Sequence, residues 1–585
     1  MYVYSEMATI QKRKSHGQTY WYIVESRRIN GKPRPVMLAY LGKAEDLLEL
    51  LTSKKRELDL CSYSHGHVAA LLNVAMELDI VGIFNKYIPA GKRGRKPLRD
   101  GLTVGASFLL GAIGRACCPT SKDGWYQWCK STSLEYCLKR SFKALDSQHF
   151  WDQMNVLPVE SIPLIEEELV KGLIEKYGVE LDTLLFDTTN FFTFIDSTNG
   201  RCAIAQRGKN KQKRCDLRQV GMALLVTRKD ELPIFHKTYR GNTHDCIVWR
   251  EEFENLTKRL KSVTNELCDI TLVFDKGNNS KHNFSLIDQT DGLHYVASLV
   301  PSCFPKLLEE ANKNLAPIKL PSKEEIPVYS TTWEVWGKRR TCVVLLSQQL
   351  LEGQVRGIQQ ALVKKCRKLQ EFKEQLESPR RRRSLSTQEI EKRIQSIIEG
   401  QYVKDILKYE IVTKNKVPSF NYFIDKLAFE HTQENQLGRQ LLVTNRSNWS
   451  TEEIISAYRA QSKVEYAFRT VKNPYHLAVR PQYHWTDQKI EAHFFMCLIA
   501  YMLVTAAYSK AKKTAAYNRG IDNFMDDLAS IRLAAVFQKS QKKKRGKAQI
   551  SYQLEKVPEC LAPLLDALGV NDTKRYSDAT FSVYK

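Results

Sequence analysis

Two aspartates stand where short apolar runs of the chain stop. Residues 184–186 are followed by Asp187, and residues 270–274 are followed by Asp275. Side chains at the strand ends of an α/β sheet face the crevice where ligands bind. Two carboxylates there repel each other unless a divalent cation lies between them, and Mg²⁺ prefers such oxygen ligands. The pattern indicates a cation site, although an aspartate after a strand is also a common turn or helix-cap residue.

A third carboxylate lies on a later segment with a helical pattern, residues 451–472. Tyr458, Glu465 and Lys472 repeat every seven residues along it, which places them on one face of a helix. Ser450 followed by acidic residues is typical of a helix start. A carboxylate between a tyrosine and a lysine fits a catalytic role, and it equally fits a row of surface ion pairs.

Residues 181–300 predict the sheet that must position these groups. Strand patterns cover residues 184–186, 219–227, 232–239, 270–274 and 293–300. Helices lie between the later strands, and Asp245 caps the first of them. Strands that first follow one another and then alternate with helices are typical of an α/β arrangement around one mixed sheet.

Residues 301–440 interrupt this regularity and predict a large inserted α+β subdomain. It holds a strand pair around residues 331–346 and long helices over residues 348–402, which are broken at 378–379 by an arginine run. Strand-like residues 422–429 and 440–444 return the chain to the main domain. At the N-terminus, residues 20–25 and 36–41 predict a β-hairpin around the turn Asn30-Gly31, and residues 44–175 are mostly helical.

The composition is that of a folded protein with an excess of positive charge. The chain has 585 residues, with 43% apolar and 26% charged residues, and its 89 Lys and Arg outnumber 65 Asp and Glu, for a net charge of +24. Such a surplus favours a polyanionic partner, with nucleic acid ahead of an anionic membrane surface. The longest apolar run, residues 494–508, has the length of a buried core helix, and neither a signal peptide nor a Cys-x-x-Cys zinc pattern is visible. A cytoplasmic location is expected.

Four short motifs occur in an order that resembles a known family. They are DTTN from Asp187, RGNTHD ending at Asp245, VFDKG around Asp275, and Tyr458, Glu465 and Lys472 with six residues between successive members. Together they resemble the DDE transposases of bacterial insertion sequences, in the group marked by a Tyr-Arg-Glu-Lys signature. The N-terminal hairpin and residues 490–493 also resemble one branch of that group, so the resemblance runs from about residue 12 to 510.

The resemblance implies a ribonuclease H-like catalytic domain, with Asp187 on the first strand, Asp275 on the fourth and Glu465 on a late helix that follows the insertion. It implies two Mg²⁺ ions, replaceable by Mn²⁺, held by these three carboxylates for phosphodiester hydrolysis. The freed 3′-OH ends would then join target DNA. It further implies binding to terminal inverted repeats and a homodimer that holds two DNA ends. The expected location is a bacterial cytoplasm, in association with the nucleoid.

One position departs from the signature. Gln461 stands where the family has an arginine, so Arg459 or Arg469 takes over its phosphate contact, or the contact is lost. Tyr458 and Lys472 are expected to position the DNA backbone.

Further DNA contacts are expected from basic segments and from two tryptophans. Solvated loops and core packing are the competing interpretations. In similar transposases an aromatic residue of the insertion holds a flipped base, and only one of the two tryptophans can face the DNA because their positions differ in parity. The candidates are Lys209, Lys211, Lys213 and Arg214 between the first two strands, Arg93, Arg95 and Lys96 in a glycine-rich loop, and Trp333 and Trp336.

These inferences divide the chain into six regions: a hairpin region (1–60), a helical DNA-binding domain (61–175), two parts of the catalytic domain (176–300 and 441–515), the inserted subdomain (301–440), and a basic C-terminal region (516–585) with the lysine-rich tract 539–547. Two other functions stay open. One is a catalytically silent or repurposed DNA-binding protein, and the other is a ribonuclease H-like metal nuclease that cuts without joining.

Overall fold

The computed structural model describes residues 8–29, 32–52, 58–88, 99–143, 145–210, 212–264, 267, 269–378, 385–414, 417–473, 475, 477, 479, 482–538 and 549–571. Several predicted features lie outside these residues: the turn Asn30-Gly31, the loop with Arg93, Arg95 and Lys96, Lys211, the arginine run 380–383 and the tract 539–547. The chain forms two compact units, Met1–Ser64 with Ile531–Val557, and His65–Ser530 with Pro558–Lys585.

The first unit contains two antiparallel three-stranded sheets. One is β1 (Ala8–Ser15), β2 (Gln18–Ile29) and β3 (Lys32–Gly42), followed by helix α1 (Ala44–Thr52). The predicted hairpin is therefore present as β2 and β3, with β1 as an additional strand. The other sheet has the order β17 (Gln549–Leu554), β16 (Arg532–Gln538) and β4 (Leu58–Ser64). A helix was predicted at β4, and this was wrong because the strand that pairs with it lies near the other end of the chain.

The second unit begins with a layer of helices around α18 (Asp487–Lys513). The 18-residue apolar stretch of this helix would be long enough to cross a membrane, but 94% of it is buried inside the protein. The prediction of a buried core helix is thus confirmed. The other helices of the unit's helical part are α2 (Gly66–Glu77), α3 (Ile80–Tyr87), α4 (Val104–Cys117), α5 (Trp125–Lys130), α6 (Leu134–Cys137), α7 (Ser147–Val156), α8 (Ile162–Tyr177), α19 (Ile521–Ser530) and α20 (Ala562–Ala567).

A nine-stranded mixed sheet forms the rest of the second unit's core, as predicted. Its order is β10-β11-β12-β15-β9-β8-β5-β6-β7, and only the neighbours β9, β8 and β5 run parallel. The strands are β5 (Thr183–Thr193), β6 (Arg218–Thr227), β7 (Pro233–Arg240), β8 (Ile270–Phe274), β9 (Leu293–Leu299), β10 (Ala316–Lys319), β11 (Glu325–Val335), β12 (Lys338–Leu346) and β15 (Arg439–Thr444). The helices beside them are α9 (Asp245–Thr264), α10 (Lys281–Asp288), α11 (Pro305–Asn314), α16 (Thr451–Arg459) and α17 (Gln461–Lys472).

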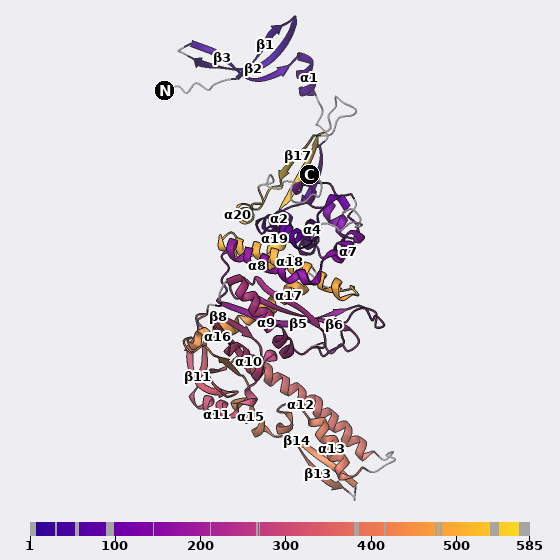
Figure 1. Ribbon diagram of the computed structural model, residues 1–585, viewed down its shortest axis with the longest axis vertical. Coiled ribbons are helices and arrows are strands. Elements are labelled where there is room, and N and C mark those ends of the chain that lie inside the picture. The colour runs from indigo at the N-terminus through magenta and orange to yellow at the C-terminus, as the bar shows by residue number, and fades with distance from the viewer. Residues whose placement is uncertain are drawn as a thin grey trace. The chain divides into compact units, whose positions relative to one another are not determined.

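The inserted subdomain is smaller than predicted. Strands β11 and β12 belong to the main sheet, because β12 pairs with β15 along its length. The insertion comprises α12 (Gln348–Glu377), α13 (Thr387–Ile398), α14 (Val403–Ile406), β13 (Leu407–Lys414), β14 (Val417–Ile424) and α15 (Lys426–Asn435). Helices α12 and α13 lie beside the β13–β14 hairpin around a core of their own (Figure 1). The strand predicted over residues 422–429 ends at Ile424, and helix α15 follows.

A buried charge cluster joins the helical part to the sheet. Glu166 on α8 accepts hydrogen bonds from His236 Nδ1 on β7 and from Arg259 Nη1 on α9, the latter at 2.7 Å. All three residues are at most 8% exposed. Burial raises the pKa of Glu166, but the charges and hydrogen bonds of His236 and Arg259 outweigh it, so that the pKa is lowered. Because the cluster bridges three elements, it fixes α8 against the sheet that carries the candidate site.

Candidate active site

Asp187 and Asp275 occupy matching positions on neighbouring parallel strands. The pairing of β5 with β8 ends at Leu185 opposite Val273, and each aspartate follows two residues later. Asp275 comes directly after β8, as predicted. Asp187 was expected at a strand end, and this was wrong because β5 continues to Thr193 as the partner of β6. The two half-buried carboxylates therefore lie where β5 loses its parallel neighbour, which opens an edge of the sheet beside them.

Two hydroxyl groups hold the Asp275 carboxylate. Its Oδ1 accepts hydrogen bonds from Ser298 Oγ at 2.9 Å and from Tyr458 Oη at 3.2 Å. Burial and the negative charge of Asp275 raise the pKa of Tyr458, so the phenol stays protonated and donates. Tyr458 was predicted to position the DNA backbone, and the structure places it against a carboxylate.

The predicted helix over residues 451–472 is two helices, which meet at Ala460. Helix α16 contacts β8, β9 and β15, whereas α17 contacts β5 and β6. The break lets one segment cover both parts of the sheet. Tyr458 and Glu465 consequently lie on different helices, and the single straight stripe predicted from their spacing was wrong.

Helix α17 is attached to β5 on both sides of Asp187. Near its start, Gln461 Nε2 donates to the carbonyl oxygen of Phe186 at 2.8 Å, and at its end Lys472 Nζ donates to Thr189 Oγ1. Gln461 is 6% exposed, so this side chain anchors the helix to the strand that carries Asp187 and is not available to a phosphate.

Glu465 lies on α17 between the two residues that attach this helix to β5. It comes four residues after Gln461 and seven before Lys472, so all three project from one face of the helix. The contacts of the other two with residues 186 and 189 place the Glu465 backbone alongside Asp187. Its side chain is exposed.

The three carboxylates have the donor chemistry that Mg²⁺ prefers. In the described part of the chain, however, no group of three or more His, Cys, Asp or Glu side chains lies close enough to hold a metal ion. The backbone thus brings the three residues to one region and the side chains do not converge there.

A tyrosine and a further aspartate lie at this site without having been predicted there. The Tyr239 ring crosses β6 over Gly221, where an added Cβ would lie 2.1 Å from the ring. Burial, followed by the charges of Asp245 and Asp187, raises the pKa of Tyr239. Asp245 also approaches Gly277, two residues after Asp275. The RGNTHD motif that ends at Asp245 was the available signal, but it supported only a helix cap and the family resemblance and gave Asp245 no role at the site.

The cations predicted to contact DNA occupy varied surroundings. Arg459 makes an ion pair with Glu324, with 2.7 Å between Nη1 and Oε2, and Arg469 lies over the ring of Tyr466. Arg214 pairs with Asp216 in the exposed loop between β5 and β6. Lys209 and Lys213 are exposed on the same loop.

The two tryptophans differ in their surroundings. Trp333 lies on β11 opposite Arg340. Trp336 lies beyond the strand end in a turn with φ of +51°, and its ring packs edge-on against Phe284 at 4.7 Å. Their alternation along one regular strand was therefore a wrong expectation, because β11 ends at Val335.

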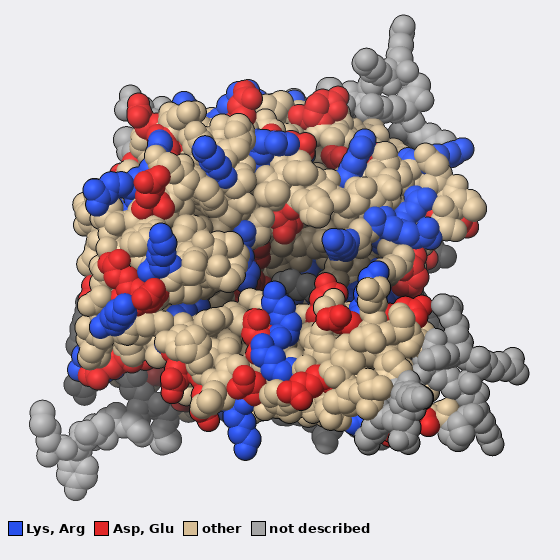
Figure 2. Space-filling view, turned by 90° about the horizontal axis from the view of Figure 1, so that it is seen from below, with Lys and Arg blue, Asp and Glu red and all other residues tan. Residues whose placement is uncertain are grey.

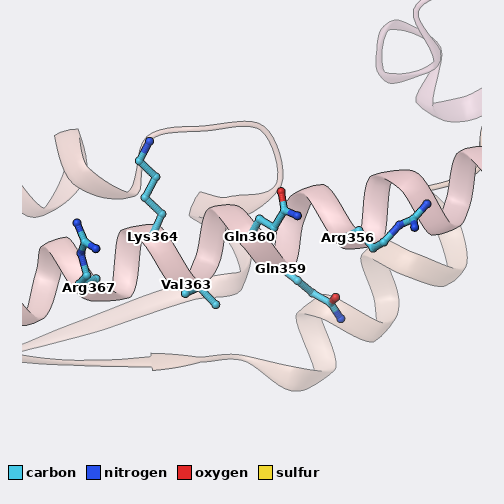
Figure 3. Close-up of a pocket in the computed structure, with 6 residues that line it drawn as sticks. All are labelled: Arg356, Gln359, Gln360, Val363, Lys364 and Arg367. Carbon is cyan, nitrogen blue, oxygen red and sulfur yellow. The ribbon is translucent and has the colours of Figure 1, made fainter.

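Both signs of charge are interspersed on the face shown in Figure 2, so the positive surplus does not form one continuous patch there. A shallow depression of about 510 Å³ lies along α12, and all of its lining residues come from this helix (Figure 3). We name this surface the α12 basic face; it consists of Arg356, Gln359, Gln360, Val363, Lys364 and Arg367. It contains no carboxylate, which distinguishes it from the candidate active site.

No protein-family model and no curated protein matched the chain. Among solved structures, the chain is similar to a cryo-EM structure of the piggyBac transposase synaptic complex with hairpin DNA. The TM-score is 0.37 at 10% sequence identity, and 79% of each chain is covered. A similarity at this level does not establish a shared fold.

Proposed function

We propose that this protein is a DDE transposase with a ribonuclease H-like catalytic domain, which cleaves the DNA ends of its own element and joins them to target DNA. The observation that carries the proposal is the register-matched pair Asp187 and Asp275, with Glu465 brought alongside by α17. The resemblance carried by the sequence motifs implies this arrangement, with carboxylates on two central strands and on a helix that follows a large insertion.

Asp187, Asp275 and Glu465 would hold the divalent cations. When bound, the cations supply Lewis acidity for phosphodiester hydrolysis and for the subsequent attack by a 3′-OH. The donor set suits Mg²⁺ or Mn²⁺, since all of its ligands are carboxylate oxygens.

Neighbouring side chains prepare this site for DNA. The hydroxyl groups of Tyr458 and Ser298 fix one oxygen of Asp275, which leaves the other oxygen free to turn toward a ligand. Lys472, at the far end of α17, carries a positive charge beside Thr189 and suits a phosphate of the bound strand. The hydrogen bond of Gln461 fixes the position of α17 along β5, so that Glu465 and Lys472 are positioned together.

DNA contacts outside the site would come from exposed cations. The α12 basic face carries three positive charges and two amides. Within the described part of the chain, its Arg356 and Lys364 make no ion pair, whereas Arg367 pairs with Glu371 at 3.2 Å. Such a row suits the phosphate backbone. We also propose that two copies act together, because each DNA end needs one such site.

The test uses the purified full chain, Mg²⁺ or Mn²⁺, and labelled duplexes that carry the inverted repeats found beside the coding sequence. Asp187→Asn, Asp275→Asn and Glu465→Gln should bind these duplexes like the wild type while cleavage and joining are lost. Asp291→Asn and Glu251→Gln remove exposed carboxylates elsewhere in the same domain and should retain both activities.

Other results would change the proposal. Binding by the wild type without cleavage in either metal would favour a DNA-binding protein without catalysis. Cleavage without joined products would favour a metal nuclease. Full activity of the Asp187→Asn variant would remove the site assignment itself.

A further inference from the structure

Three aromatic side chains lie exposed on one surface beyond the end of β5. Phe194 is 51% exposed, Tyr483 61% and Trp485 40%. The rings of Phe194 and Tyr483 are 5.6 Å apart. Large aromatic side chains usually bury most of their surface, so their joint exposure on adjoining loops indicates a surface that other groups cover.

Two cations lie over the same surface. The Arg201 guanidinium is 5.4 Å from the centre of the Trp485 ring, and Lys489 Nζ is 5.6 Å from it. We name Phe194, Tyr483, Trp485, Arg201 and Lys489 the stacking platform. A surface that carries both aromatic rings and cations matches a nucleic-acid strand, whose bases stack and whose phosphates are negative.

The two loops that carry the platform are tied together by hydrogen bonds. Phe194 N donates to the Gln482 carbonyl at 3.0 Å, and Asn199 Nδ2 donates to the Trp485 carbonyl at 3.1 Å. The Asp487 carboxylate accepts from the backbone N–H groups of residues 203 and 204. These bonds hold the rings in place before a partner arrives, which lowers the entropy cost of binding.

Two acidic side chains lie near the platform, and both accept hydrogen bonds from neighbouring groups. Asp487 is engaged by the two backbone N–H groups, and Asp196 Oδ1 accepts from the backbone and hydroxyl of Thr198 at 2.7 Å. Hydrogen bonds from Thr198 lower the pKa of Asp196, so it stays charged, but its oxygen is already occupied by donors. Asp196 keeps its negative charge, so Arg201 and Lys489 must outweigh it for a phosphate to bind here.

The platform lies on the continuation of the strand that carries Asp187. Seven residues separate Asp187 from Phe194, which corresponds to about 23 Å along an extended strand. A DNA strand whose bases stay stacked as in a duplex advances about 3.4 Å per nucleotide, so roughly seven such nucleotides would span this distance. A strand cut at the active site could thus reach the platform with its unpaired end.

We propose that the stacking platform binds unpaired DNA bases of the strand that leaves the active site. This inference rests on the proposed function for the origin of the strand, although the binding itself can be measured without catalysis. The platform is separate from Trp333 and Trp336, and it places base stacking at the loops around α18 and not at β11 or the turn that follows it. A second copy of the chain is the other occupant that its exposed rings would suit.

The test measures binding of a fluorescent 12-nucleotide oligo-dT and of a 12-base-pair duplex to the full chain by anisotropy. Stacking on an aromatic residue is worth roughly 5- to 150-fold in affinity per base. Tyr483→Ala and Trp485→Ala should each weaken oligo-dT binding within that range and affect the duplex less. Trp485→Tyr should retain most of the affinity, because it keeps an aromatic face. Phe423→Ala, which removes a 50% exposed ring in the insertion, should bind like the wild type.

Several outcomes would overturn the proposal. One is unchanged oligo-dT binding by Tyr483→Ala and Trp485→Ala, and another is equal loss by Trp485→Ala and Trp485→Tyr. A shift in sedimentation that follows these variants, with DNA binding unchanged, would assign the surface to a second copy. The Asp187→Asn variant separates the two proposals, because it should lose cleavage and keep oligo-dT binding. Failure of the wild type to cleave would refute only the proposed transposase activity.

Discussion

Replacement of Glu166 by glutamine tests whether the buried charge cluster holds the helical part against the sheet. The carboxylate is 2% exposed and is the acidic partner of both His236 and Arg259. Glutamine keeps the shape but removes the negative charge. Arg259 would then stay buried with neutral acceptors alone, namely the glutamine amide oxygen and the backbone carbonyls of residues 163 and 234.

The magnitude follows from this burial. Removal of one partner of a buried ion pair costs about 3–5 kcal/mol, because the remaining charge is left without compensation. Glu175 lies on the same helix and is exposed, so Glu175→Gln should change the free energy of unfolding by less than about 0.5 kcal/mol. Thermal and urea unfolding of the full chain, with hydrogen exchange of α8 and β7, would measure both variants.

The pH dependence of the free energy of unfolding is a second test of the same cluster. The pKa of Glu166 is lower in the folded protein than its ordinary value, so its contribution to stability is present above the unfolded pKa of about 4.3. That contribution is lost as the pH falls through the folded pKa, and Glu166→Gln should lack this loss. The reasoning would be refuted if the Glu166→Gln variant were as stable as the wild type at pH 7. It would also be refuted if the variant lost stability at acidic pH in the same way as the wild type.

Three further predictions concern the site and the surfaces around it. Tyr458→Phe removes a hydrogen bond to the charged Asp275 carboxylate, and such a bond is worth about 1.5–3 kcal/mol. Cleavage should therefore slow roughly 10- to 150-fold while DNA binding stays unchanged. Weaker binding with normal cleavage would contradict the assigned role. Gly221→Ala would force a Cβ into the Tyr239 ring, so we expect the free energy of unfolding, measured in urea, to fall by about 1–3 kcal/mol. An unchanged unfolding midpoint would show that the ring moves freely. Replacement of the three cations of the α12 basic face by glutamine should reduce the slope of log binding constant against log salt by up to about 2.7. The matched control replaces three exposed lysines of the same subdomain, Lys404, Lys408 and Lys426, by glutamine, and an equal slope in both variants would argue against this face.

The sequence was most informative where contacts are local. Strands 219–227 and 270–274 were predicted almost to the residue, because continuous apolar runs between polar turns indicate buried strands. Pairing between distant segments carried no such signal. Strand β4 resembled part of a helical region, and its pairing with β16 depends on residues near the other end of the chain. The same limit explains why β11 and β12 were assigned to the insertion, since only the pairing of β12 with β15 shows that they extend the main sheet.

The candidate site was predictable in residue type and only partly in geometry. Spacing alone could not show that the helix breaks at Ala460, because the break depends on the two parts of the sheet that α16 and α17 cover. The break changes the role of two positions. Tyr458 turns to Asp275, and Gln461 faces the backbone of β5 instead of a phosphate.

The position of Gln461 bears on whether the departure from the signature argues for lost function. A residue that faced DNA at this position would be exposed, and its replacement would directly weaken a phosphate contact. Here the side chain is buried and donates to the strand residue directly before Asp187. Its amide therefore contributes to the placement of α17, and through it to the placement of Glu465 and Lys472. The departure from the signature is thus compatible with the proposed catalysis, in which exposed cations elsewhere would make the phosphate contact.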